Sequence, residues 1–249
     1  MILLQQITKI FNKGKINEVK ALEEVSLQIH DGDFAIMIGA NGSGKTTLLN
    51  IISGNEMCSS GKICIDETDI TTLPEFRRSR WIARVFQNPY NGTAPDLTIL
   101  DNFRLAALRT RKKKLRIGVS AAFRNKVREK VAMLGMGLEN KLLQPIGSLS
   151  GGQRQALTLL MSVMDDTQVL LLDEPTAALD PKSARIVLNL ADTLIREYHL
   201  TALLVTHNLK DAQQYGNRLI QLHEGKIVRD LHKEAKEKLL LQNMFEWFG

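Results

Sequence analysis

The segment GANGSGKTT at residues 39–47, which we call the phosphate loop, constrains the fold of this chain more than any other feature. It fills every required position of the pattern G-x-x-x-x-G-K-[ST]. The apolar stretch DFAIMI precedes it, and the apolar stretch LLNIIS follows it. Glycines let the backbone wrap around a triphosphate with its N–H groups pointing inward, while the lysine neutralises phosphate oxygens. The sequence therefore predicts a strand, a phosphate-binding loop and a helix, in that order.

The phosphate loop is assigned to nucleotide binding, and the hydroxyl group of Thr46 is also placed to bind Mg²⁺. The assigned residues are Gly39, Asn41, Gly42, Ser43, Gly44, Lys45, Thr46 and Thr47. The alternative is a glycine turn with a surface lysine, which leaves the position between a strand pattern and a helix pattern unexplained.

Two consecutive carboxylates follow the apolar stretch VLLL, at Asp173 and Glu174. Open α/β sheets bind ligands outside the carboxyl ends of their strands, so both side chains are expected near the phosphate loop. Asp173 is assigned to Mg²⁺, and Glu174 to the general base that polarises an attacking water. An acidic turn that caps the next helix is the alternative, and a complete phosphate loop in the same chain disfavours it.

Apolar periodicity divides the chain into three parts. Strand patterns occupy the first part, which ends with a strand that stops at Gln87. Residues 88–144 instead carry apolar residues at the three- and four-residue spacing of helices. Buried-strand patterns then return, with a helix that starts at Pro181 between two of them. The pattern predicts an α/β core interrupted by one helical insertion.

Composition limits the possible partners. The chain has 249 residues and a formal net charge of +6, which leaves nucleic acid or an anionic membrane surface open as partners. No run of about 18 apolar residues occurs, so no membrane span is expected. The two cysteines, Cys58 and Cys64, lack the spacing of metal ligands and are expected to be a reduced pair.

Six short motifs then occur in a fixed order: GANGSGKTT, VFQ, LSGGQ, LLLDEP, ALD and LVTH. With this set, the chain resembles the nucleotide-binding subunits of ATP-binding cassette (ABC) proteins from about Leu3 to Val228. The resemblance implies a P-loop NTPase core with a mixed sheet, an N-terminal antiparallel β subdomain and a helical subdomain. It also implies an ATPase domain at residues 1–232, with its core at 1–87 and 145–232 and the helical insertion at 88–144. Residues 233–249 then form a C-terminal amphipathic tail.

The resemblance assigns roles to four further residues. Gln87 would contact Mg²⁺ or the attacking water, and His207 would contact the γ-phosphate of ATP; each is also an ordinary residue at a strand end. Asp180 would pass information across a dimer, although it also suits the N-cap before Pro181. Phe11 would stack on adenine, and a core phenylalanine is the alternative.

The signature segment, LSGGQ at Leu149–Gln153, has the composition of an anion site at a helix start. The resemblance implies that it serves the nucleotide of another chain. Two chains would pack head to tail and hold ATP between the phosphate loop of one and the signature segment of the other. The residues assigned to this contact are Ser150, Gly151, Gly152 and Gln153.

The resemblance also implies a function and partners. The chain would power transmembrane transport from the cytoplasmic side of the cell membrane, bound to separate permease subunits. Residues Asn88–Pro95 would contact them, with Tyr90 as an anchor. Import of a small solute is expected, an amino acid being one candidate, together with an extracytoplasmic solute-binding protein. The alternatives are an exporter or lipoprotein-release ATPase and, in another class, a DNA- or ribosome-associated ATPase, although nucleic acid is not the expected partner.

Two segments have open interpretations. Residues 109–116 carry six basic side chains, which suits a solvated loop or a contact with anionic lipid headgroups. The tail, LHKEAKEKLLLQNMFEWFG, is expected to form one short amphipathic helix. It would dock on the domain's own core, the alternative being a partner or membrane contact.

Overall fold

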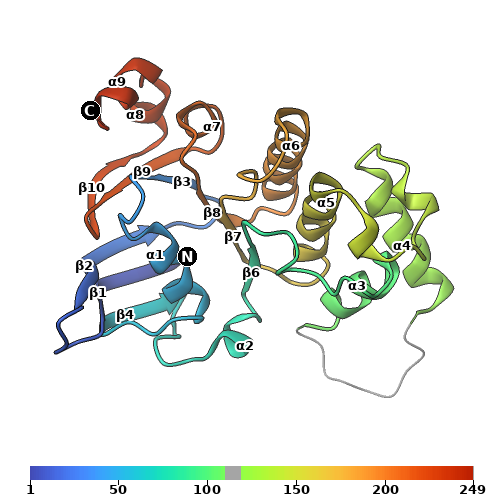
Figure 1. Cartoon of the computed structure of the whole chain (residues 1–249), viewed down its shortest axis with the longest axis horizontal. Coiled ribbons are helices and arrows are strands. Elements are labelled where there is room, and N and C mark those ends of the chain that lie inside the picture. Colours follow the sequence, from blue (N-terminus) through green and yellow to red (C-terminus); the bar gives the residue numbers. More distant parts are fainter. Residues whose placement is uncertain (110–118, 249) are drawn as a thin grey trace.

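The strand before the phosphate loop lies inside a six-stranded sheet in the computed structural model, which describes residues 1–109 and 119–248 (Figure 1). The strands, in spatial order, are β10 (Lys226–Leu231), β9 (Arg218–His223), β3 (Phe34–Ile38), β8 (Thr201–Val205), β7 (Val169–Asp173) and β6 (Ile82–Val85). All neighbours pair in parallel except β10, which is antiparallel to β9. The sheet is therefore mixed, as expected, and its parallel strands end at one edge.

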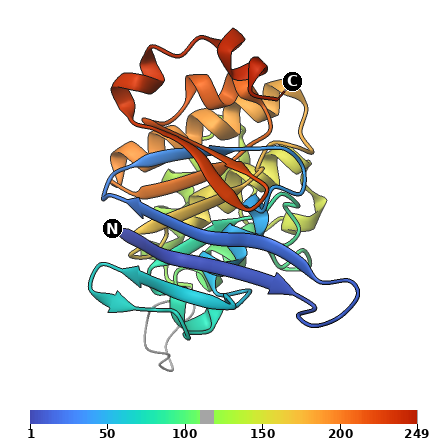
Figure 2. The same cartoon turned by 90° about the vertical axis from the view of Figure 1, so that its left-hand side faces the viewer.

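A second, antiparallel sheet is formed by the N-terminal part of the chain (Figure 2). Its strands, in spatial order, are β2 (Val19–Ile29), β1 (Ile2–Phe11), β4 (Ser60–Ile65) and β5 (Thr68–Asp69). Helix α1 (Lys45–Ser53) shares one hydrophobic core with both sheets. Its residues Leu48, Leu49, Ile51 and Ile52 are fully buried, which is typical of a helix covered on several sides. The phosphate loop is thus held between two sheets.

The other face of the mixed sheet packs against helices. Phe34, Ile36 and Ile38 of β3 contact that core, whereas Ala35 and Met37 point to α1, as the two-residue period of a strand requires. The helices over this face include α3 (Ile99–Ala106), α4 (Ala121–Ala132), α5 (Gly151–Ser162), α6 (Pro181–Glu197) and α7 (Leu209–Gln214). Short turns of 3₁₀-helix span Leu138–Asn140 and Ile146–Ser148. No helix formed by residues 1–109 or 119–248 combines the length and apolar character needed to cross a bilayer.

Helix starts follow the side chains that the sequence offers. Thr98 caps α3 by accepting a hydrogen bond from the backbone N–H of Asp101, and Ser120 caps α4 in the same way. Helix α2 (Glu75–Arg78) has no counterpart among the predicted elements, because four residues are too few to show a period. Most of the predicted basic stretch, residues 110–116, lies outside the described residues.

The tail differs from the expected single helix. It forms two short helices, α8 (Lys233–Glu237) and α9 (Leu241–Glu246). Met244 is fully buried in the main core, so the expected docking on the domain itself is confirmed for the described residues. Lys236 is also buried, donates to the carbonyls of Tyr215 and Gly216, and loses water, which lowers its pKa to about 8.

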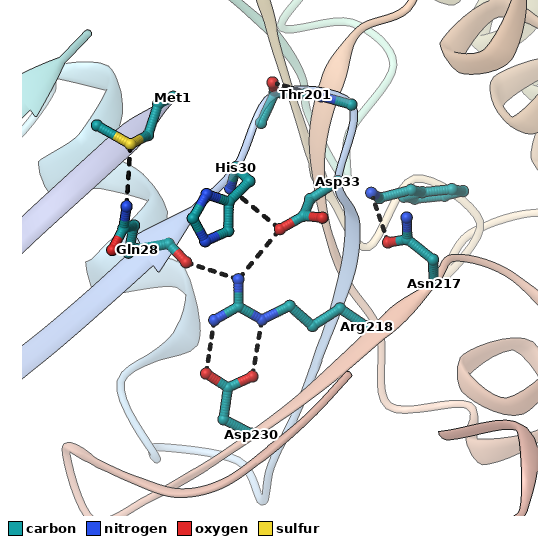
Figure 3. A network of polar contacts seen from close by, with 10 residues as sticks. Met1, Gln28, His30, Asp33, Thr201, Asn217, Arg218 and Asp230 are labelled. Carbon is teal, nitrogen blue, oxygen red and sulfur yellow. Dashed lines mark hydrogen bonds and ion pairs between the residues drawn. The ribbon is translucent and has the colours of Figure 1, made fainter. Parts of the chain in front are cut away.

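A buried arginine joins the two sheets (Figure 3). Arg218 of β9 forms two hydrogen bonds with the carboxylate of Asp230, at 2.7 Å from Nε and 2.6 Å from Nη2. Its Nη1 donates to the backbone carbonyl of Gln28 in β2 at 2.6 Å and to Asp33 at 3.1 Å. Burial alone would lower the pKa of Arg218, but the hydrogen bonds and charges of Asp230 and Asp33 outweigh it and raise the pKa.

We expect Arg218→Met to lower the free energy of unfolding by about 1.5–3 kcal/mol, because it removes the charge-assisted hydrogen bonds that the buried guanidinium donates to the partly exposed carboxylates of Asp33 and Asp230. Chemical denaturation followed by circular dichroism measures this loss. Lys226→Met is the matched control, since Lys226 pairs with Glu23 on the surface at 3.2 Å and should matter little. If both substitutions lowered the free energy of unfolding equally, the stabilising role of Arg218 between the two sheets would be contradicted.

Candidate active site

The phosphate loop is shaped by close packing against β2. The backbone φ of Gly44 is +103°, and a Cβ atom there would lie 2.5 Å from the carbonyl oxygen of Ala21. Only glycine fits this position without strain. No side chain caps the first turn of α1 in the described structure, so its backbone N–H groups are available to an anion. The loop can therefore cradle phosphate groups, and the predicted order of strand, loop and helix is confirmed.

Lys45 lies inside this loop. Its side-chain nitrogen Nζ donates to the backbone carbonyls of Gly39 at 2.9 Å and Ala40 at 2.8 Å. Burial lowers the pKa of Lys45, and the carboxylates of Glu174 and Asp173 oppose that shift. The loop carbonyls hold the ammonium group where a phosphate bound by the loop would meet it.

Asp173 is the last residue of β7 and is almost fully buried. The hydroxyl group of Thr46 lies 3.3 Å from its oxygen Oδ1. Both are hard oxygen ligands of the kind that Mg²⁺ prefers, and Mg²⁺ takes few protein ligands because water and phosphate complete its octahedron. Thr46 and Asp173 therefore fit Mg²⁺ bound together with a nucleotide.

The sequence interpretation missed Arg84 of β6. Its Nη2 lies 2.6 Å from the second carboxylate oxygen of Asp173, and both side chains are more than nine-tenths buried. The segment WIARVFQ was interpreted only as an apolar strand. A charged residue inside such a strand was the signal available, because a buried charge needs a partner.

Glu174 and His207 come together across neighbouring strands. Nδ1 of His207 lies 3.1 Å from Oε2 of Glu174, and the backbone N–H of Glu174 donates to Val205 at 3.0 Å. The φ of Glu174 is +45°, a left-handed conformation that is uncommon outside glycine and is often found at functional sites. This conformation follows the end of β7 directly, where the strand gives way to the turn before Asp180.

The signature segment begins α5 through a capping box. Ser150 accepts a hydrogen bond from the backbone N–H of Gln153, whose side chain in turn accepts from the N–H of Ser150. A Cβ atom on Gly152 would lie 2.6 Å from Cβ of Ser183, so this turn packs directly on the start of α6. Gly151 is exposed beside it. The helix-start chemistry expected from the sequence is present.

Asp180 caps α6, as its alternative interpretation predicted. Its carboxylate accepts from the backbone N–H groups of Lys182 and Ser183, each at 3.0 Å. Hydrogen bonds, first of all from Ser183, lower its pKa. The same serine contacts Gly152, so the ALD motif and the signature segment share one packing site.

The segment after β6 packs on α5. Gln155 donates to the backbone carbonyl of Phe86 at 2.9 Å, and the guanidinium of Arg154 lies 3.7 Å from the ring centre of Tyr90. Gln87 itself is exposed two residues beyond the end of β6. The predicted permease-contact segment thus packs against α5, the helix that begins at the signature segment.

Two predicted nucleotide contacts, Phe11 and Asn41, have none of the hydrogen bonds described above. Phe11 ends β1 in the antiparallel sheet, is half-buried, and has Nζ of Lys9 4.8 Å from its ring centre. Asn41 is exposed on the phosphate loop, near a hollow that His207, Phe245 and others line. Phe11 is therefore not a core residue, and its contact with adenine stays a prediction.

Together, the phosphate loop, the two carboxylates and the strand-end histidine define a P-loop nucleotide-binding protein of the cassette type. The chain belongs to the ABC transporter family, whose model matches residues 22–177. This confirms the resemblance inferred from the six motifs, and with it ATP as the nucleotide and ATP hydrolysis as the activity of the class.

Known proteins are similar along the whole chain. The tyrosine transport ATP-binding protein of Clostridioides difficile is 44% identical over 100% of this chain and 98% of its own length. A macrolide export ATP-binding/permease protein of Campylobacter jejuni is 37% identical over 98% of this chain but only 36% of its own length. Among solved structures, the dimeric ATP-binding cassette MJ0796, bound to ADP and Pi, has a TM-score of 0.80 and 29% identity. It covers 93% of this chain, and the match spans 98% of its own.

Proposed function

We propose that the chain hydrolyses Mg²⁺-bound ATP through Glu174, His207 and Gln87 and thereby powers import of a small solute. The observation that carries the catalytic part is the Glu174–His207 contact of 3.1 Å at the ends of β7 and β8, beside the strand that leads into the phosphate loop. An amino acid is the proposed solute, because a relative that is 44% identical over the whole chain is a tyrosine transport protein.

The chain's own residues divide the work of phosphoryl transfer. The N–H groups of the phosphate loop and Lys45 bind and orient the phosphates, which supplies most of the catalysis in this reaction class. Thr46 and Asp173 would hold Mg²⁺, which neutralises charge on the phosphate oxygens when bound. Glu174 accepts a proton from the attacking water, while His207 orients that carboxylate and reaches toward the γ-phosphate. Gln87, which is exposed after the end of β6, would contact Mg²⁺ or the attacking water.

The nucleotide is proposed to lie between two copies of this chain. The capped turn at Ser150 and the exposed Gly151 present a helix N-terminus to solvent, which suits an anion from outside the chain. The dimeric cassette bound to ADP and Pi supports a dimer as the working form. Ser150, Gly152, Gln153 and Asp180 of one copy would close the site of the other.

Membrane subunits are proposed to bind at Asn88–Pro95. Tyr90 is 53% exposed while its ring packs on the buried Arg154, so one face is free and the other touches the signature helix. A partner that pushes on Tyr90 therefore acts on α5 directly. We propose that the chain works at the cytoplasmic side of the membrane, and that a solute-binding protein serves the same permease from outside.

Export is the second candidate, because a macrolide export protein is also a relative. We favour import because that relative carries its permease in the same chain, and separate ATP-binding subunits in this family occur most often in importers. A DNA- or ribosome-associated function is disfavoured by the names of both relatives, each of which describes transport.

Replacing Glu174 with Gln should leave ATP binding intact but slow hydrolysis by about 100-fold or more, because the amide cannot accept the proton. A closed dimer should then accumulate in ATP, which light scattering coupled to gel filtration detects. Glu24→Gln is the matched control, since Glu24 is exposed and has the same left-handed backbone, with φ of +49°. Wild-type turnover in Glu174→Gln would refute the general-base role.

Transport direction can be measured in vesicles that contain the cognate membrane subunits and this chain, with the cognate solute-binding protein supplied on the opposite side of the membrane. With ATP supplied on the side of the ATPase, labelled tyrosine should move toward that side, and the Glu174→Gln subunit should reduce the rate to background. Movement of solute away from the ATPase side would show export instead. ATP hydrolysis without movement of tyrosine would rule out the proposed solute.

A further inference from the structure

Arg84 makes the most unusual contact of the site. The two-residue period of β6 points Ile82 and Arg84 to the side of α1, and Ala83 and Val85 to the other core. The guanidinium Nη1 donates to Oδ1 of Asn50 at 2.7 Å and lies 3.4 Å from Oγ of Ser53, both in α1. Nη2 lies 2.6 Å from Oδ2 of Asp173 in β7. One side chain therefore joins three elements of the nucleotide site.

The two carboxylate oxygens of Asp173 have different neighbours. Oδ2 accepts from Arg84, whereas Oδ1 faces the hydroxyl group of Thr46 at 3.3 Å. Taking a guanidinium out of water is costly, so this arginine depends on its partners, and they depend on it. Because both oxygens are engaged, the plane of the carboxylate is fixed relative to Thr46.

We propose that Arg84 is a positioning residue for magnesium: it holds Oδ2 so that only Oδ1 of Asp173 faces the metal beside Thr46. The inference rests on the proposed Mg²⁺-dependent ATPase function. Groups that orient a metal ligand commonly change metal affinity by 10–100-fold when removed. The planar guanidinium suits this role, since it reaches Asp173 and Asn50 at once from a fixed fork.

The position of Arg84 also connects the metal site to Gln87. Only Val85 and Phe86 separate the two residues, and the ring of Phe86 lies under the guanidinium, 4.8 Å from its carbon to the ring centre. The carbonyl of Phe86 is in turn bonded to Gln155 of α5. A shift of the segment after β6 would therefore act on the side chain that holds the carboxylate of Asp173.

The test measures how much Mn²⁺ strengthens ADP binding, by titration calorimetry with Mn²⁺ and with EDTA. We expect Arg84→Met to bind ADP in EDTA as the wild type does, and to lose about tenfold or more of the strengthening by Mn²⁺. Arg84→Lys should lose less, because lysine keeps the charge but reaches only one partner. Arg80→Met is the matched control, since Arg80 is exposed and stacks on Trp81 at 5.4 Å.

The outcomes separate the possibilities. An unchanged effect of Mn²⁺ in Arg84→Met would overturn the inference, and a larger effect would show that the guanidinium competes with the metal. Arg84→Lys takes the place of Arg84→Met if the latter does not fold. In that case, Arg84→Lys that binds ADP like the wild type, both in EDTA and with Mn²⁺, would overturn the inference. No strengthening by Mn²⁺ in the wild type would instead refute the proposed metal-dependent function.

Discussion

The parallel pairing of β3, β8 and β7 is the constraint on which the rest of the site depends. In register, Met37 pairs with Val205, and Val205 pairs with Asp173, so the three strands end at the same level. The phosphate loop, the histidine after β8 and the two carboxylates then meet at one edge, although they are far apart in the chain. A shift of β7 by one residue would turn Asp173 away from Thr46.

Two connected groups of contacts organise the molecule around that edge. One group centres on Asp173 and includes Thr46, Arg84 and Asn50, and it fixes the side of the site where Mg²⁺ is proposed to bind. The other centres on α5, where Gly152 packs on Ser183 and Arg154 packs on Tyr90. The hydrogen bond from Gln155 to Phe86 links the two groups. A membrane partner bound at Tyr90, as proposed, would therefore act on both the signature segment and the proposed metal site.

Much of this could be predicted from the sequence, because local patterns determine it. The phosphate loop, the buried strand before Asp173 and the helix start at Pro181 each follow from a few consecutive residues. The contacts of Arg84 and Arg218 could not be predicted, since their partners come from strands and helices distant in sequence. The prediction of a single helix in the tail was wrong for a related reason. The burial of Met244 and Lys236 is decided by tertiary packing, not by periodicity. The left-handed backbone conformation of Glu174 could not be predicted either, because no residue type near it indicates a positive φ.

The signature segment of one copy is proposed to complete the nucleotide site of another. Disulfide trapping tests it directly, using a chain without native cysteines that carries Asn41→Cys and Ser150→Cys. In the Glu174→Gln background, we predict a cross-linked dimer on a non-reducing gel when ATP is present and monomer when it is absent. A cross-link within one chain, or thiols that stay unreacted with ATP bound, would contradict the account.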